Sequence, residues 1–451
     1  MFRKVLIANR GEIALRIIRA CKELGIGTVT VHSTADRNSL HVRFADQSIC
    51  IGPPQARDSY LSVPNLMSAL EISGADAVHP GYGFLAENAE FAEDCGRAGV
   101  TFIGPTPDQI RRMGDKATAK ATVREAGIPL ITGSLGVLRD IDEALEVAEV
   151  AGYPVLLKAT AGGGGKGMKL AESKETLPSM FRLARAEAMA CFGNGDLYLE
   201  KFIVKPRHIE VQVLGDQHGN VVHLGERECS LQRRHQKVLE EAPSPLVDPE
   251  MRAKLGAAAV AAARAINYSS AGTIEFLADA NKDFYFIEMN TRIQVEHPIT
   301  EMITGVDLVK QMILSAAGEP LPFTQDDIEL RGHAIECRIN AEDPFTFAPC
   351  PGRIDGYHEP GGYGVRVDSW VHDGCNVLPY YDSLLGKLIT WGRDRDEAIV
   401  RMRWALDEYV VEGIKTTVPF HRAVIRDPEF LSGVFDTGYI ERFLARRDAG
   451  A

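Results

Sequence analysis

This sequence has no long apolar run, and we expect it to carry no export signal. Its longest apolar stretch, near residues 256–263, falls well short of the roughly 20 residues that a membrane-spanning helix needs. The first residues enter a strand-like run at once, where a signal or transit peptide would need a segment of its own. We therefore expect a protein that neither spans a membrane nor is anchored to one.

Closely spaced cysteine pairs and an excess of positive charge are also absent. Eight cysteines are scattered along the 451 residues, and no two have the CxxC spacing of a zinc or redox site. Free thiols are typical of a reducing compartment, so we expect a cytoplasmic protein. Lysine and arginine number 50 against 62 acidic residues, a net charge of -12. Such a chain does not favour general nucleic-acid binding, although a local basic cleft for an anionic substrate is compatible with it.

Two common nucleotide-binding fingerprints are missing as well. The turn at residues 9–12 stands where a dinucleotide-binding sheet carries GxGxxG, and it lacks that pattern. A second glycine-rich loop precedes Lys166 and Gly167, but Met168 follows where a Walker A loop has Ser or Thr. This loop contains Gly162, Gly163, Gly164 and Gly165. Its flanks are strand-like, and glycine lets backbone N–H groups approach a polyphosphate closely, so we favour a phosphate-covering hairpin tip over a plain surface turn.

The order of elements predicts an α/β protein of two or three domains. Apolar, strand-like runs at 4–8, 28–32, 75–79 and 100–103 alternate with helical patterns at 12–24, 63–72 and 87–98. This alternation indicates an open, largely parallel sheet. A long helix is expected over residues 106–126 and another over 141–151, and the chain after about residue 203 is mixed α and β.

A predicted hairpin near residue 280 has the highest density of candidate functional residues. Two β-favouring runs, 273–276 and 284–287, flank a turn-like cluster at 279–283. A tight turn centred on Asn281 and Lys282 places Glu275 directly opposite Glu288, and period-two alternation puts Asn290 on the same face. Two carboxylates and an amide oxygen suit a hard divalent cation that carries phosphate.

Just beyond this predicted metal site the sequence brings a cation and an acid together. Arg292 would extend from the same face as Asn290 if the strand continues, and Glu296 follows four residues later. A guanidinium can clamp an anion with two hydrogen bonds, and a carboxylate beside it can act as a base. We therefore expect an anion-binding half next to the metal half.

Seven motifs, in this order, resemble the biotin carboxylases of the ATP-grasp superfamily over roughly residues 1–446. They are IANRGEIALRI at 7–17, HPGYGFLAEN at 79–88, MGDKATAK at 113–120, YPVLLKATAGGGGKGM at 153–168, RHIEVQVL at 207–214, ERECSLQRRHQKVLEEAP at 226–243 and EMNTRIQVEHPITE at 288–301. The resemblance implies an α/β ATP-grasp fold with a Rossmann-like parallel-sheet N-terminal domain (1–114), an ATP-grasp domain (115–330) and a mixed α+β C-terminal domain (331–447). A mobile lid is expected over about 130–203.

The resemblance also implies the ATP contacts. Lys116 and Lys158 would touch the phosphates beneath the glycine loop, although a strand-end lysine taken alone is more simply solvated. Backbone groups of Lys201 and Ile203 would meet the adenine edge, within the segment Glu200, Lys201, Phe202 and Ile203. The remaining pocket residues would be His208, Gln232, His235 and Leu277. Without the matched motifs, Leu277 would be a core residue and His208 a structural histidine.

The implied reaction is ATP-dependent carboxylation of biotin by bicarbonate through carboxyphosphate. Mg²⁺ or Mn²⁺ would bind Glu275, Glu288 and Asn290. Bicarbonate would bind Lys237, Arg292, Gln294 and the backbone of Val295. Glu296 would be the base, kept ionised by Arg292, and Arg338 would stabilise the biotin enolate. Tyr82 either borders the biotin pocket or caps a turn of the first domain.

The expected partners follow from the same resemblance. No Met-Lys-Met segment for biotin attachment occurs, so biotin is expected on a separate biotin carboxyl carrier protein. Carboxyltransferase subunits would complete the complex, most simply a bacterial acetyl-CoA carboxylase of fatty acid synthesis, and the chain would form a homodimer. The alternatives are a pyruvate or other acyl-CoA carboxylase, another ATP-grasp ligase that traps an acyl phosphate with an amine, and a non-catalytic nucleotide-binding regulator.

Overall fold

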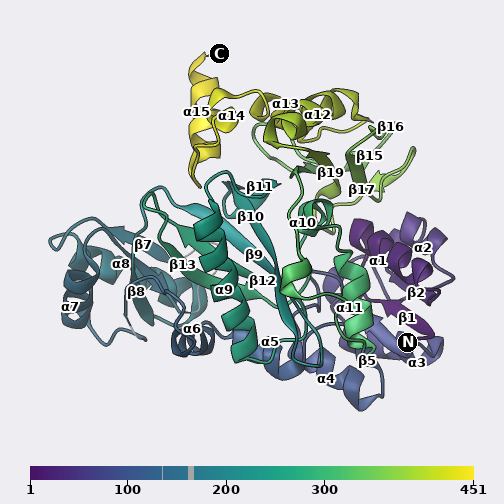
Figure 1. Cartoon of the computed structure of the whole chain (residues 1–451), viewed down its shortest axis with the longest axis horizontal. Coiled ribbons are helices and arrows are strands. Elements are labelled where there is room, and N and C mark those ends of the chain that lie inside the picture. Colours follow the sequence, from purple (N-terminus) through teal and green to yellow (C-terminus); the bar gives the residue numbers. More distant parts are fainter. Residues whose placement is uncertain (135, 161–166, 451) are drawn as a thin grey trace.

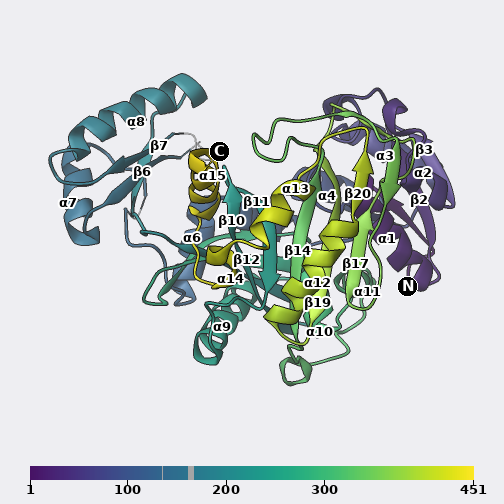
Figure 2. The ribbon, with the colours of Figure 1, turned by 90° about the horizontal axis from the view of Figure 1, so that it is seen from above.

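The computed structural model describes residues 1–134, 136–160 and 167–450. The predicted loop residues Gly162, Gly163, Gly164 and Gly165 lie outside this range. Within it, no helix has both the length and the apolar character needed to cross a membrane. The described residues form three sheets of three or more strands, and Figures 1 and 2 show the molecule from two directions.

The N-terminal residues form the predicted parallel sheet. Five strands run in the order β3-β2-β1-β4-β5, and every pair is parallel. The strands are β1 (Lys4–Ile7), β2 (Gly27–His32), β3 (Gln47–Cys50), β4 (Ala77–His79) and β5 (Thr101–Phe102). The accompanying helices are α1 (Gly11–Glu23), α2 (Leu40–Phe44), α3 (Val63–Ser73) and α4 (Ala89–Arg97), with short 3₁₀ turns at Thr34–Asp36 and Ala56–Asp58.

The helix expected over residues 106–126 is wrong in one respect, because it is broken in two. Helix α5 (Pro107–Gly114) ends just before Asp115, whose ψ of 111° is extended rather than helical. Helix α6 (Lys116–Glu125) then begins, and the Asp115 side chain accepts the N–H of Thr118 at 2.8 Å. An aspartate in this position caps a new helix, which explains the break.

The segment predicted as the lid has a hydrophobic cluster of its own. Its sheet runs β7-β6-β8, with β6 (Val155–Ala159), β7 (Met168–Ala171) and β8 (Leu197–Lys201). Helices α7 (Ile141–Ala151) and α8 (Leu177–Phe192) accompany this sheet, and the unit lies at the left of Figure 1. That the lid moves stays a prediction.

The largest sheet is antiparallel throughout and runs β13-β12-β9-β10-β11-β14-β19-β17. Its strands are β9 (Arg207–Gly215), β10 (Val221–Arg233), β11 (Gln236–Ala242), β12 (Ser270–Ala278), β13 (Phe284–Asn290), β14 (His333–Asn340), β17 (Val365–Ser369) and β19 (Leu384–Gly392). Because β11 pairs with β14, the sheet is continuous across the domain boundary predicted at residue 330. The predicted division at 114 and 330 stays a proposal.

Helices and short strands surround this sheet. The helices are α9 (Pro249–Ala265), α10 (His297–Thr304), α11 (Leu308–Ala316), α12 (Arg395–Glu408), α13 (Val418–Val424), α14 (Pro428–Leu431) and α15 (Tyr439–Gly450), with a 3₁₀ turn at Gln325–Asp327. Two short ribbons pair β15 (Gly352–Arg353) with β18 (Asn376–Val377), and β16 (Gly356–His358) with β20 (Val410–Glu412).

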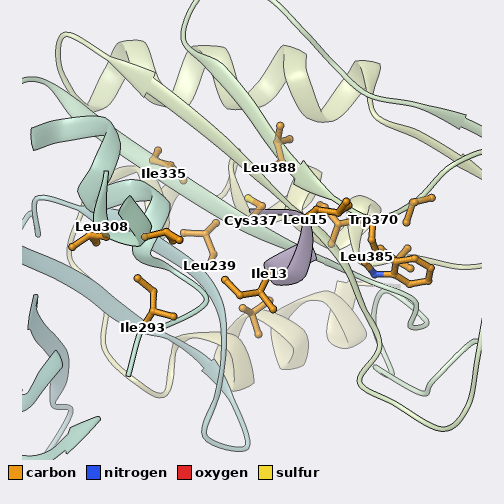
Figure 3. Close-up of a cluster of buried hydrophobic side chains, with 14 of the residues drawn as sticks. Ile13, Leu15, Leu239, Ile293, Leu308, Ile335, Cys337, Trp370, Leu385 and Leu388 are labelled. Carbon is orange, nitrogen blue, oxygen red and sulfur yellow. The ribbon is translucent and has the colours of Figure 1, made fainter. Parts of the chain in front are cut away.

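One hydrophobic cluster joins the N-terminal domain to the large sheet. Figure 3 shows Ile13 of α1 among Leu239 of β11, Cys337 of β14 and Leu385 of β19. All four are at most 2% exposed. Apolar burial on this scale fixes the first domain against the sheet that carries the candidate site.

Candidate active site

The β12–β13 hairpin brings the predicted metal ligands together. Glu275 and Glu288 are register partners, which confirms the predicted pairing. Close to the turn the register is one residue different, with Phe276 opposite Phe286, and a bulge beside Glu275 restores the predicted alignment. Asn290 joins the group, since its side-chain N–H donates to Glu275 Oε1 at 2.9 Å.

The electrostatics of this hairpin fit a divalent cation. Burial and the facing Glu275 carboxylate raise the pKa of Glu288, and the charge of Lys116 offsets part of that rise. Two close carboxylates and an amide are oxygen donors of the kind that Mg²⁺ binds together with phosphates. Asn290 Oδ1 accepts a hydrogen bond from Arg292 at 3.0 Å, so the amide oxygen of the metal half points toward the guanidinium of the anion half.

Lys237 links the metal half to the anion half. Its ammonium donates to Glu275 Oε1 at 3.0 Å and to Glu296 Oε1 at 2.6 Å, and it also contacts Glu210. Arg338 reaches Glu296 from the other side, with Nη2 2.9 Å from Oε2. Burial alone would raise the pKa of Glu296, but the charges of Lys237, Arg338 and Arg227 hold it well below its usual range. Glu296 is therefore an ionised, buried carboxylate.

Arg292 is not the main group that keeps Glu296 ionised, because Lys237, Arg338 and Arg227 contribute most, although the charges of Arg292 and Glu296 do attract each other. Arg292 makes its ion pair with Glu87, whose Oε2 lies 2.8 Å from Nε, and no ion pair joins it to Glu296 among the residues that the structure describes. The strand ends at Asn290, so alternation no longer governs where the Arg292 side chain points. Glu87 lies in the motif HPGYGFLAEN at 79–88, which is the signal that could have identified it.

A buried arginine, Arg227, is hydrogen-bonded to the anion half, and the sequence analysis did not identify it. Arg227 is 0% exposed and donates to Gln294 Oε1 at 2.8 Å, while Gln294 donates to Glu275 at 3.0 Å. Its other acceptors are Glu210, Gln212, Thr273 and Thr300. All these bonds together fix the Gln294 amide, so this predicted bicarbonate contact is rigidly placed.

The backbone of Val295 is held by a second buried cation. Lys387 of β19 is 0% exposed and donates to the Val295 carbonyl at 2.8 Å. Its Nζ also lies 3.2 Å from Glu12 Oε1 of α1. The segment before Glu296 is thus tied to both flanking domains.

The predicted phosphate lysine Lys158 is paired rather than solvated. It forms an ion pair with Glu200, and so does Lys120, which the predictions omitted although it ends the motif MGDKATAK. Burial alone would raise the pKa of Glu200, but the two ammonium groups lower it. Lys116, at the start of α6, is exposed, and its positive charge acts to lower the pKa of Glu288.

The predicted adenine segment, Glu200 to Ile203, begins in strand β8, at the C-terminal end of the predicted lid. The Lys201 N–H donates to the Thr132 carbonyl at 2.7 Å, so of its two backbone groups only the carbonyl is left to meet a base. Its side chain donates to the carbonyls of Gly152 and Tyr153. The Phe202 N–H donates to the Pro154 carbonyl at 3.0 Å, and Ile203 is half-buried.

Three of the four remaining pocket residues gather on neighbouring strands. His208 Nδ1 lies 2.9 Å from Gln232 Nε2, and Leu277 is the register partner of His208. His208 Nε2 lies 3.1 Å from Glu275 Oε2, which links this group to the metal half. His235 is exposed in the β10–β11 turn, where its φ is 66°.

Tyr82 has a structural contact. Its hydroxyl donates to Glu12, and its half-buried ring packs against the main core. The Arg338 charge acts on the phenol, so the residue is near the anion half. The turn-capping interpretation has direct contacts, and the biotin-pocket interpretation stays a prediction.

Comparison with known families identifies this arrangement. Residues 1–110 match the family model of the biotin carboxylase N-terminal domain, and residues 336–442 match that of the biotin carboxylase C-terminal domain. Residues 115–324 between them match the ATP binding domain of the carbamoyl-phosphate synthase L chain. A biotin carboxylase of Nostoc sp. is 58% identical over 441 residues, which cover 98% of this chain and 99% of the relative. The chain belongs to the biotin carboxylase family.

Solved structures of biotin carboxylases have the same fold. A biotin carboxylase from Campylobacter jejuni, determined as a β-γ-ATP complex, is 50% identical with a TM-score of 0.93, and covers 98% of this chain and 99% of its own. The biotin carboxylase domain dimer of a Hydrogenobacter thermophilus 2-oxoglutarate carboxylase, with MgADP, ADP and bicarbonate, is 52% identical with a TM-score of 0.91 and 98% coverage of both chains. As a biotin carboxylase family member with an ATP-grasp fold, the chain is an ATP-dependent ligase.

Proposed function

We propose that this enzyme activates bicarbonate with ATP as carboxyphosphate and transfers the carboxyl group to biotin on a separate carrier protein. The proposal rests on the surroundings of Glu296. This residue is an ionised carboxylate, 2% exposed, held between Lys237 and Arg338 and joined through Lys237 to the metal half. A charged base beside two cations suits an anionic substrate that must lose a proton.

In the first step, the base and the anion clamp act together. Arg292, Lys237, Gln294 and the Val295 backbone bind bicarbonate, and Glu296 takes its O–H proton. The oxygen that lost the proton attacks the γ-phosphorus of ATP, the bond to the β-phosphate oxygen breaks, and ADP leaves with carboxyphosphate formed. Bicarbonate is a poor nucleophile, so removal of its proton is the part that this site has to supply.

The ATP is held by the lid side of the site. Lys116 and Lys158 face its phosphates, and Lys120 joins them through the ion pairs at Glu200. His208, Gln232 and Leu277 line the nucleotide pocket, and His235 reaches it from the turn. A divalent cation on Glu275, Glu288 and Asn290 supplies charge neutralisation at the phosphate oxygens when bound, Mg²⁺ being the first choice and Mn²⁺ the second.

In the second step, carboxyphosphate gives CO₂ and phosphate, and the phosphate takes the ureido N1 proton of biotin. The resulting enolate oxygen binds Arg338, and N1 then attacks CO₂. Donors placed where negative charge develops stabilise it strongly in a buried site. Tyr82 borders this biotin position.

For the acceptor of the carboxyl group we propose acetyl-CoA, handled by separate carboxyltransferase subunits in fatty acid synthesis. The Nostoc relative is described as a biotin carboxylase alone, which supports a free-standing subunit. The Hydrogenobacter relative belongs to a 2-oxoglutarate carboxylase, so a 2-oxo acid is the second candidate. That relative is a dimer, which supports a homodimer here, and eight free cysteines support a cytoplasmic location.

The direct test is ATP hydrolysis that depends on bicarbonate and rises when free biotin is added. Glu296→Ala should bind ATP nearly normally and lose turnover, because the base is gone while the phosphate contacts stay. Full turnover in this variant would remove Glu296 as the base. No stimulation of the natural enzyme by biotin would instead favour another ATP-grasp ligase, and a chain that binds ATP without any hydrolysis would be a regulator.

A further inference from the structure

Two buried glutamates lie side by side behind Arg338. Glu240 of β11 and Glu336 of β14 are direct register partners in the antiparallel pair, and both are 0% exposed. Residues directly opposite each other in such a pair project from the same face of the sheet, within about 5.5 Å of each other. The two carboxyl groups therefore share one enclosed space.

Most oxygens of this pair have no hydrogen-bond partner. Glu240 Oε1 accepts from Arg338 Nε at 2.6 Å, but Glu240 Oε2 and both oxygens of Glu336 have none within the described parts of the chain. A buried carboxylate without hydrogen bonds is costly, and two of them together are more so, because like charges repel in a low-dielectric interior. A single proton between the two groups relieves both costs by turning one oxygen into a donor.

The surroundings of the pair supply too little positive charge to keep both groups ionised. The charges that act most strongly on the pair are those of Lys237 of β11, Arg338 of β14, Lys387 of β19 and Glu296 before α10. Lys387 is already committed to Glu12 and the Val295 carbonyl. Burial raises the pKa of Glu336 well above its usual range, more than Lys387 lowers it, and Glu240 adds to the rise. Burial raises the pKa of Glu240 too, against the charge of Arg338.

We propose that Glu336 carries a proton that it shares with Glu240, and that Glu240, so kept anionic, is the positioning residue for Arg338. Arg338 is held on two sides, by Glu240 and by Glu296. Once Glu296 has taken the bicarbonate proton, its hold on Arg338 weakens, and Glu240 is then the anion that keeps the guanidinium aimed at biotin. This role rests on the proposed function, whereas the shared proton does not.

The shared proton can be measured directly. At pH 8, the infrared spectrum of the natural protein should contain a C=O stretch from a protonated carboxyl group, and this band should be lost in Glu336→Gln. Glu319→Gln, at an exposed position, should keep the band. A natural protein without the band, or a band that survives in Glu336→Gln, overturns the shared proton. This readout does not depend on activity.

The positioning role is tested by comparing two rates of the same enzyme. In Glu240→Gln, the ratio of biotin-stimulated to biotin-free ATP hydrolysis should fall at least about tenfold, since a misplaced group costs that much or more. Glu240→Asp should restore part of the ratio, and Glu319→Gln should leave it unchanged. A ratio that stays at the natural value in Glu240→Gln overturns the role. If the natural enzyme itself shows no biotin stimulation, the proposed function fails while the infrared result still stands.

Discussion

Lys237 holds three carboxylates at once, those of Glu210, Glu275 and Glu296. Lys237→Met removes the main cation that depresses the pKa of Glu296, so that pKa should rise. Because the base must be ionised, the acid limb of the pH profile of kcat/KM for bicarbonate should move to higher pH, with a lower maximum. Lys237→Arg should keep the limb closer to its natural position. A lower maximum with an unmoved limb would show that Lys237 does not set the ionisation of Glu296.

A second prediction at the residue scale concerns Glu288, whose pKa is raised by burial and by repulsion from Glu275. Glu288→Gln removes this repulsion, so the Tm of the metal-free protein should rise slightly. The same change removes a metal ligand, so the Mg²⁺ concentration needed to bind ADP tightly, measured by calorimetry, should rise about tenfold or more. A lower metal-free Tm would contradict the repulsion between Glu288 and Glu275, and an unchanged Mg²⁺ requirement would contradict a metal role for Glu288.

Local alternation predicted the Glu275–Glu288 pairing correctly but not the turn, because the strand ends nearest the turn pair in a register one residue different and the bulge beside Glu275 brings the two glutamates opposite each other. Ion-pair partners could not be predicted in this way. Arg292 and Glu296 are four residues apart, yet Arg292 binds Glu87 and Glu296 binds Lys237 and Arg338. A charged side chain pairs with whichever opposite charge the tertiary fold brings closest, and sequence distance does not reveal it.

At the scale of elements, the break between α5 and α6 depends on one cap. Asp115→Ala removes the acceptor for the Thr118 N–H and should cost about 1 kcal/mol of unfolding free energy in urea. Asp115→Ser keeps a capping oxygen and should cost much less. Equal losses in both variants would mean that the cap does not stabilise this helix start.

The same break shows what periodicity can and cannot predict about elements. The helix expected over 141–151 is α7 (Ile141–Ala151), since capping aspartate Asp140 and apolar spacing agree there. Residues 106–126 have helical spacing on both sides of Gly114 and Asp115, so the spacing alone does not reveal that a capping aspartate starts a second helix. The feature of the sequence that best indicates the start of α6 is the capping residue Asp115 itself.

At the scale of the whole molecule, the sheet that crosses residue 330 could not be predicted from local patterns. Strands β11 (Gln236–Ala242) and β14 (His333–Asn340) are distant in sequence and pair edge to edge. Non-local pairing of this kind depends on the tertiary fold rather than on either strand's own pattern. It places Glu240 toward Arg338, and the next residue, Glu241, projects from the opposite face of the sheet.

Glu241 joins the sheet to the C-terminal helices and predicts how the molecule responds to acid. It accepts from His333 Nε2 and from Arg395 Nε, each at 2.7 Å, and is 1% exposed. Burial alone would raise its pKa, but the His333 hydrogen bond and the Arg395 charge lower it from 4.5 to about 2. A depressed carboxyl pKa stabilises the fold above the unfolded-state value, and this stabilisation is lost as pH falls toward the folded-state value.

Glu241→Gln should therefore cost about 3 kcal/mol of unfolding free energy at neutral pH, and the difference from the natural protein should shrink between about pH 5 and pH 2. Urea unfolding at a series of pH values measures both curves. Glu397→Gln, an acid-to-amide change in α12 near Arg395 with a partly exposed side chain, is the matched control and should show a much smaller difference at neutral pH. Curves for Glu241→Gln and the natural protein that stay parallel down to pH 2 would show that this ion pair does not link the sheet to the C-terminal helices energetically.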